Sequence, residues 1–220
     1  INIHTSMINV QVFTCNMLQE NCFIISDETK ECAIIDCGAF YQEERDMIID
    51  YIKKNQLIPK HLLATHGHLD HNFGNSCMQK EFGLTPKVHH KDKFLMESIK
   101  QQAQLLLGLD LTEEQPKDVD YLTKDDVIEF GNQRFTIIET PGHTPGSVFF
   151  YNEKEHIAFS GDTIFKRSIG RTDLEGGSMF QIIQTLRFVS QLPDKTILYP
   201  GHGESTTIGD ELSSNPYIDR

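Results

Sequence analysis

The sequence predicts an α/β (α+β) protein in which mixed β-sheets carry helices on their outer faces. Short alternating or apolar runs typical of strands open the chain, strand–helix pairs follow, more strands come next, and a helix and a strand close it. This order favours helix-covered sheets, because each element must bury its apolar side against another layer. A length of 220 residues suits one domain with one substantial core.

The first half of the chain predicts three strands followed by strand–helix units. Residues 7–16 alternate in the manner of a strand, and the segment 41–55 places Ile48 and Ile52 on one helical stripe. The predicted elements of this half are strands at 7–16, 21–27, 32–36 and 61–64, and helices at 41–55, 72–82 and 91–107.

The second half predicts a loop, further strands and a capped helix. Its predicted elements are a polar, acidic loop or mobile flap at 108–120, a hairpin at 127–139, and strands at 147–151 and 156–160 that pair with each other. Ser178 with Gln181 three residues later is typical of a capping box, and it predicts a helix that ends before Pro193.

Composition argues against several classes of partner. The net charge of -12 is unsuited to a nucleic-acid surface, which needs a basic stripe. No stretch approaches the roughly 18 apolar residues of a membrane span, and no secretory leader is recognisable. Five cysteines, odd in number and without a Cys-x-x-Cys pair, favour a reducing compartment. We therefore expect a cytoplasmic protein with neither nucleic-acid nor membrane partners.

Five histidines and two aspartates follow apolar runs that predict buried strands. A strand end projects a side chain rigidly, and the turn beyond it leaves room for an ion. The seven residues are His66, His68, Asp70, His71, His143, Asp162 and His202. Glycine stands beside nearly every one of them, which lets the backbone turn sharply and approach a bound ligand.

The spacing His-x-His-x-Asp-His predicts a metal site in a turn, because His66 and His68 would point apart on a helix. Without metal, so many histidines together would form a costly like-charge cluster. The remaining alternative, a structural zinc, is disfavoured because such sites are closed and cysteine-rich, and every cysteine precedes residue 78. The histidines that stand alone, which we expect to be ordinary surface or core residues, are His4, His61, His89, His90 and His156.

Seven donors exceed the roughly four that one zinc needs, so we expect two divalent ions per chain. A carboxylate can bridge two cations that lie about 3.5–4 Å apart. The expected split is His66, His68 and His143 on the first ion, Asp70, His71 and His202 on the second, and Asp162 between them. Nitrogen and oxygen donors suit zinc best, and they also accept iron or manganese.

Five segments together resemble one family: Thr65–His71, Thr140–Gly146, Ser160–Thr163, Gly170–Asp173 and Pro200–Gly203. With them the chain resembles metallo-β-lactamase-fold hydrolases of the glyoxalase II type, the hydroxyacylglutathione hydrolase-like proteins. The resemblance implies an αββα sandwich of two mixed sheets with helices outside and metals at one edge. It also implies a single domain over residues 1–220, which we expect to lack the C-terminal helical extension that helps such hydrolases hold glutathione.

Departures from the family pattern narrow the reaction. Asp162 stands where β-lactamases of the cysteine type have a cysteine, which disfavours that assignment. Glu204 stands where the family has a tyrosine, and Arg171 aligns with its glutathione-contacting lysine. Arg171 and Lys166 are therefore expected to attract a small anionic thioester. Leucines 105–107 are expected either to pack in the core or to line a substrate groove.

The resemblance implies a metal-dependent thioester hydrolase in which a hydroxide bridging two divalent ions attacks the carbonyl. Asp70 and Asp162 are the expected catalytic residues, the first as ligand and orienter of the hydroxide, the second as bridge. One alternative is a persulfide dioxygenase, whose single iron would take His66, His143 and Asp162. The other alternative is a non-catalytic metal-binding protein of the same fold.

Overall fold

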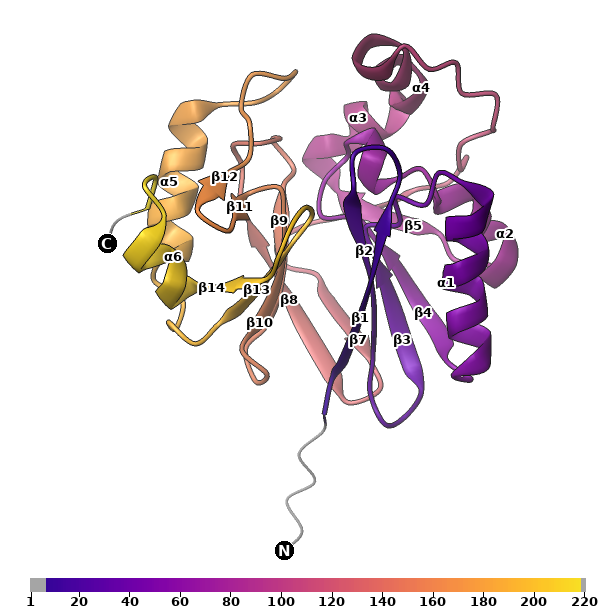
Figure 1. The fold of residues 1–220 in the computed structure, drawn as a ribbon, viewed down its shortest axis with the longest axis horizontal. Helices are drawn as coiled ribbons and strands as arrows, with labels where there is room; N and C mark the ends of the chain where they lie inside the picture. The colour runs from indigo at the N-terminus through magenta and orange to yellow at the C-terminus, as the bar shows by residue number, and fades with distance from the viewer. Residues whose placement is uncertain (1–6, 219–220) are drawn as a thin grey trace, which may run out of the picture.

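Two six-stranded sheets lie against one another at the centre of the structure, with helices on their outer faces (Figure 1). The structure is a computed structural model, and it describes residues 7–218. The first half of the chain forms one sheet and the second half forms the other (Figure 1). The predicted sandwich of mixed sheets flanked by helices is therefore confirmed. The single domain over 1–220 stays a prediction, and its residues 1–6 and 219–220 lie outside the described residues.

The first sheet has the strand order β1-β2-β3-β4-β5-β6. Its strands are β1 (Asn9–Cys15), β2 (Glu20–Ser26), β3 (Glu31–Ile35), β4 (Ile58–Leu63), β5 (Pro86–His89) and β6 (Asp120–Leu122). The first three strands pair antiparallel, and β3 to β6 run parallel. Its larger helices, which cover the outer face, are α1 (Gln42–Lys54) and α2 (Asn75–Phe82) (Figure 1).

The second sheet has the order β14-β13-β10-β9-β8-β7. Its strands are β7 (Val127–Phe130), β8 (Gln133–Glu139), β9 (Val148–Asn152), β10 (Ile157–Gly161), β13 (Ile197–Pro200) and β14 (Thr206–Thr207). A small hairpin is formed by β11 (Ile164–Phe165) and β12 (Ser168–Ile169), and the covering helices are α5 (Met179–Val189) and α6 (Ile208–Ser214) (Figure 1). Strand β10 pairs parallel with β13 and antiparallel with β9.

Aromatic side chains fill the space between the sheets. Phe135, Phe150 and Phe159 are buried there with Phe23 from the first sheet. Burying one such ring contributes about 1.5–3 kcal/mol, so this layer holds the two halves of the chain together. Two further apolar layers lie under the helices, one beneath α1 and one beneath α5. Strand β2 is buried along its whole length because it has a layer on each side.

The helix predicted over residues 91–107 is wrong as one element. The chain there forms η2 (His90–Asp92), α3 (Lys93–Glu97), α4 (Ile99–Gln102) and the π-helix η3 (Ala103–Leu107). The break comes at Ser98, where the carbonyl of Leu95 accepts bonds from Ser98 N and Oγ and from Gln102 Nε2. These bonds end α3 early, because side-chain donors satisfy a carbonyl that a continuing helix would use.

The remaining predicted elements agree in type with the structure, apart from their boundaries. The helix predicted at 72–82 begins only at Asn75, because residues 69–71 form the short 3-10 helix η1 (Leu69–His71). One half of the predicted capping box of α5 is present, with Ser178 Oγ accepting a hydrogen bond from Gln181 N at 3.2 Å, while Ser178 N donates to the Gly142 carbonyl instead of to the Gln181 side chain. Strands β5 and β6 were not predicted, since three or four residues carry too little alternation. None of the described helices is long and apolar enough to cross a membrane.

Candidate metal centre

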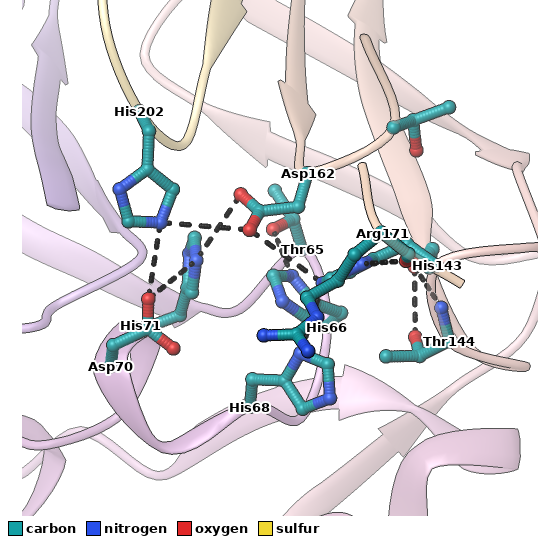
Figure 2. A network of polar contacts seen from close by, with 12 residues as sticks. Thr65, His66, His68, Asp70, His71, His143, Thr144, Asp162, Arg171 and His202 are labelled. Atoms are coloured by element: carbon teal, nitrogen blue, oxygen red, sulfur yellow. Dashed lines mark hydrogen bonds and ion pairs between the residues drawn. The ribbon is translucent and has the colours of Figure 1, made fainter. Parts of the chain in front are cut away.

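The seven predicted ligands meet at one edge of the sandwich (Figure 2). They follow the ends of four strands, β4, β8, β10 and β13, so four separate turns supply one site. All are buried except His202, which is partly exposed. Gly161 adopts φ +49, and a side chain at Gly201 would lie 2.3 Å from Asp162 Oδ1, so both positions require glycine.

The structure brings together the first predicted triad. The ligand atoms of His66, His68 and His143 all lie within 4.8 Å of one another. His68 Nδ1 lies 2.9 Å from His143 Nε2. Three converging imidazole nitrogens are what a zinc-like ion requires of a protein when a further position is left for water.

The second predicted triad is equally compact. The ligand atoms of Asp70, His71 and His202 lie within 4.8 Å of one another. Asp70 Oδ2 is 3.1 Å from His202 Nε2 and 3.4 Å from His71 Nε2. The triad therefore offers one carboxylate and two imidazoles.

Asp162 lies between the two triads, as Figure 2 shows. Its Oδ1 is 3.3 Å from His71 Nε2, and its Oδ2 is 3.6 Å from His143 Nε2 and 3.5 Å from His202 Nε2. It thus faces histidines of both triads. This position suits the predicted bridge between two cations. The role of the seven residues as metal ligands stays a prediction.

The outward-facing nitrogen of four of the histidines meets a protein oxygen. The pairs are His66 Nδ1 with Thr65 Oγ1 at 3.1 Å, His71 Nδ1 with Asp36 Oδ2 at 3.1 Å, His143 Nδ1 with the Arg171 carbonyl at 2.7 Å, and His202 Nδ1 with the Leu18 carbonyl at 3.1 Å. A carbonyl oxygen can only accept, so the Nδ1–H groups of His143 and His202 donate. In the neutral form that binds metal, each Nε2 is then left as a lone pair that faces the centre.

This arrangement fits divalent metal. Among the described residues, His66 Nε2, His71 Nε2 and Asp162 Oδ1 are buried and have no hydrogen-bond partner. The Nε2 lone pair of His202 also faces a carboxylate oxygen. Buried polar atoms without partners are costly, and two facing lone pairs repel. A divalent cation between these atoms removes both costs, and nitrogen and oxygen donors are the ones zinc, iron and manganese accept.

Burial and neighbouring charges set the protonation of the centre. Burial, aided by the neighbouring imidazoles, lowers the pKa of His66 well below its usual range and that of His68 to about 3. Both rings are therefore neutral at pH 7, as a metal ligand must be. Burial also disfavours the charged form of Asp162, but the neighbouring His71 outweighs this and holds the pKa of Asp162 well below the ordinary value.

Asp36, which was not among the predicted site residues, orders the loop that carries the first four ligands. Its Oδ1 accepts from Thr65 N at 2.6 Å and its Oδ2 from Thr65 Oγ1 at 2.7 Å, while His71 lies against it. Because the Thr65 hydroxyl donates to Asp36, it accepts from His66. The available signal was the aspartate directly after the apolar strand β3.

Asp92 was also missed, because it falls within the long helix predicted there. It is fully buried and accepts from Gly67 N at 2.8 Å, Thr144 Oγ1 at 2.7 Å and Gly146 N at 2.6 Å. Gly67 lies between two ligands of the first triad, and Thr144 follows the third. One carboxylate therefore ties together the two loops that form this triad.

The two predicted substrate-binding residues occupy different places. Arg171 lines the pocket over the metal centre, where it forms a two-pronged ion pair with Asp173 at 2.7 and 2.8 Å. Lys166 pairs with Glu204 and is not among the residues that line this pocket. Their substrate-binding role stays a prediction.

The histidines expected to be ordinary lie outside the two triads, apart from His4, which is outside the described residues. His89 and His90 do form a group with Glu139 that has metal-like spacing. There, Glu139 Oε1 already contacts His89 Nε2 at 2.9 Å and Lys91 Nζ at 3.2 Å, so a cation is in place.

The chain is similar in sequence and in structure to several known proteins. A family model described as the metallo-beta-lactamase superfamily matches residues 15–202. Hydroxyacylglutathione hydrolase GloC of Haemophilus influenzae is 36% identical over 212 residues, which cover 96% of this chain and 98% of that protein. Two solved structures match with a TM-score of 0.85 and 32% identity: BLEG-1 B3 metallo-beta-lactamase, with 96% of this chain and 99% of that chain covered, and TTHA1623 in a di-iron-bound form, with 95% and 100% covered.

Proposed function

Because the chain belongs to the metallo-beta-lactamase superfamily, whose fold binds divalent metals, we propose that it is a metal-dependent thioester hydrolase with two ions per chain. The observation that carries the proposal is the pair of complete triads with Asp162 between them. The relative named hydroxyacylglutathione hydrolase supports a thioester as the substrate class. The solved relative in a di-iron-bound form supports two ions, with zinc the ion we expect and iron or manganese accepted.

The chemistry that bound divalent ions supply is a water whose pKa falls to about 7 and a positive pole for the carbonyl oxygen. In the hydrolysis, a water oxygen adds to the acyl carbon, the C–S bond breaks, and the products are a carboxylate, a thiol and a proton. A thiolate leaves readily because the pKa of its thiol is only about 8.5.

The chain itself orients the water and holds charge. Burial raises the pKa of Asp70, but the neighbouring histidines, His71 first, outweigh this and lower it. Asp70 is therefore ionised at neutral pH, and its carboxylate can accept a hydrogen bond from the attacking water. Asp162 is also ionised, because the neighbouring His71 lowers its pKa, and its carboxylate contacts histidines of both triads.

A nucleophilic side chain is not needed for this reaction. Among the described residues, no serine or cysteine lines the pocket over the metal centre. Burial raises the pKa of the Cys32 thiol to about 12, and it raises that of Cys15 still further, so neither supplies a thiolate at pH 7.

Arg171 and Lys166 are the residues assigned to the negative charge of the substrate. We assign Arg171 to an anionic part of the thiol moiety because it lines the pocket, although its guanidinium must then exchange Asp173 for substrate. Lys166 is assigned to longer-range attraction only, because it is exposed and paired with Glu204.

A second candidate is β-lactam hydrolysis, which is favoured by the 32% identity to a solved B3 metallo-beta-lactamase. The aspartate at position 162 speaks only against enzymes of the cysteine type. The persulfide dioxygenase alternative, which uses one iron, is tested in parallel by measuring oxygen uptake.

The test uses protein loaded with zinc and checked for metal content. Thiol release is followed with a glutathione thioester and with an uncharged thioester, and β-lactam opening and oxygen uptake on glutathione persulfide are measured in parallel. We expect thiol release that His71→Ala abolishes. If the fully metal-loaded protein hydrolyses no thioester but is active in either parallel assay, the proposed function is wrong and the activity found in that assay takes its place.

A further inference from the structure

Leucines line the pocket that opens onto the metal centre, and we propose that they bind an apolar acyl group of the substrate. This inference rests on the proposed hydrolase function and adds a substrate class to it. The class is thioesters of medium-length aliphatic acids, in preference to short hydroxyacids.

Metal-centre residues and leucines line the same pocket, whose volume is about 310 Å³. On the metal side the lining residues are His68, Asp70, His143, Asp162 and His202, and the apolar ones include Leu18, Leu106, Leu107 and Leu174. An acyl carbonyl held at the metals therefore places its alkyl chain among leucines. The volume is at the lower end of the roughly 300–1,000 Å³ of ligand pockets, which suits a group of modest size.

These leucines come from three separate parts of the chain. Leu18 lies in the turn between β1 and β2, Leu106 and Leu107 lie in η3, and Leu174 lies in the loop before α5. Figure 1 shows the β1–β2 turn and the segment around α4 at the same end of the molecule. Convergence of unconnected segments on one pocket is what a binding site requires.

Folding does not account for the two most exposed of them. Leu106 is 44% and Leu18 is 41% exposed, and neither belongs to an apolar cluster of residues 7–218. Leu107 differs, because it packs against the cluster of Leu69 and Phe73. Exposed apolar side chains that gather around one pocket are typical of a groove that binds an apolar ligand.

The backbone around Leu106 is unusual as well. Segment η3 is a π-helix that ends at Gly108, whose φ is +64, and Leu109 N donates to Ala103 O at 3.1 Å. π-helical turns are rare and frequently lie at functional sites. Here the turn presents Leu106 to the pocket.

The walls offer little to a polar acyl group. Arg171 is the one lysine or arginine among the described lining residues, and both prongs of its guanidinium are held by Asp173. An alkyl chain gains from the leucines, whereas a hydroxyl group placed against them loses its hydrogen bonds to water.

The experiment compares N-acetylcysteamine thioesters of acetic, butanoic, hexanoic and lactic acid on zinc-loaded protein. One uncharged thiol throughout keeps any contribution of Arg171 constant. Each methylene buried against the leucines is expected to raise kcat/KM by up to roughly fourfold, and we expect at least about tenfold from acetyl to hexanoyl. The lactoyl thioester should be poorer than the butanoyl one.

Variants locate the preference. Leu106→Ala and Leu18→Ala should each lower the hexanoyl-to-acetyl ratio of kcat/KM by roughly threefold or more. The matched control is Leu105→Ala, since Leu105 is the neighbouring leucine of η3, is 84% exposed and does not line the pocket. It should leave the ratio unchanged.

A binding measurement separates this inference from the proposed function. Calorimetric titration of zinc-loaded protein with hexanoate and with acetate should show tighter hexanoate binding and a negative heat-capacity change, and Leu106→Ala should weaken it. If that holds while no thioester is hydrolysed, the apolar site stands and the proposed function fails. If thioesters are hydrolysed without chain-length preference, or Leu105→Ala acts like Leu106→Ala, the acyl site is refuted and the hydrolase stands.

Discussion

Replacing Asp92 by asparagine removes charge and one acceptor from the group that joins the two loops of the first triad. The Asp92 carboxylate satisfies three buried donors, two through Oδ2 and one through Oδ1. Asn has one oxygen and one donor group of nearly the same shape. In Asp92→Asn, at least one of Gly67 N, Thr144 Oγ1 and Gly146 N must therefore lose its partner.

The magnitude follows from burial. A buried donor left without a partner costs about 1–3 kcal/mol, and Asp92 is fully buried. Because Gly67 and Thr144 adjoin ligands of the first triad, much of this cost should appear as misplacement of those ligands. Mutation of residues that hold metal ligands in position typically lowers metal affinity by about 10- to 100-fold, so we expect zinc affinity to fall by a factor in that range.

The assay measures zinc affinity by chelator competition and the melting temperature of the metal-free protein. The matched control is Asp27→Asn. Asp27 is also buried and accepts four bonds, from Thr29 N and Oγ1, Asn132 N and Gln133 Nε2. It follows the end of β2, which runs antiparallel to β3 and so ends at the edge opposite the metal centre. Both variants should melt earlier, but only Asp92→Asn should bind zinc more weakly. Equal zinc affinity in the two variants would refute the positioning role.

Three further predictions concern charge. Asp162→Ala should release both metals and abolish hydrolysis, because the shared carboxylate no longer screens their repulsion, whereas full metal with a normal rate would exclude the bridge. Arg171→Ala should raise KM for a glutathione thioester by about two- to fivefold, a modest effect because the side chain is exposed and paired with Asp173. An equal rise in KM for an uncharged thioester would show that Arg171 acts on the structure of its loop instead of on the substrate. Burial raises the pKa of Asp27, but its hydrogen bonds outweigh this and lower it. The contribution of Asp27 to stability should therefore be complete above the pKa of an unfolded aspartate, about 3.9, and be lost as the pH falls below it. The difference in melting temperature between wild type and Asp27→Asn should then narrow from about pH 5 to about pH 2.5. A constant difference would contradict this.

Local patterns predicted the strands, most of the helices and the seven candidate ligands, whereas the sandwich of two sheets was expected from the family resemblance. Apolar runs mark the strands, and ligand residues stand directly after them, as at His66 and Asp162. The pairing of β10 with β13 depends instead on residues about 40 positions apart, and periodicity carries no information about it.

Other features depend on tertiary contacts that leave no local trace. Asp92 lies in a segment with helical periodicity, and its function becomes visible only when Gly67 and Gly146 approach it. The break of the helix at Ser98 depends in the same way on where Gln102 points. The pairing of Arg171 with Asp173, two residues on, was within reach of sequence reasoning, but only the structure gives its two-pronged geometry.

The most direct test of the central claim is the metal content of the chain, measured by elemental analysis after mild loading with zinc and removal of the excess. The account predicts two ions per chain, with thioester hydrolysis reaching its full rate only when the second ion is present. A stable content of one ion, with His71 and His202 free of metal in a crystal structure, would contradict the two-metal centre.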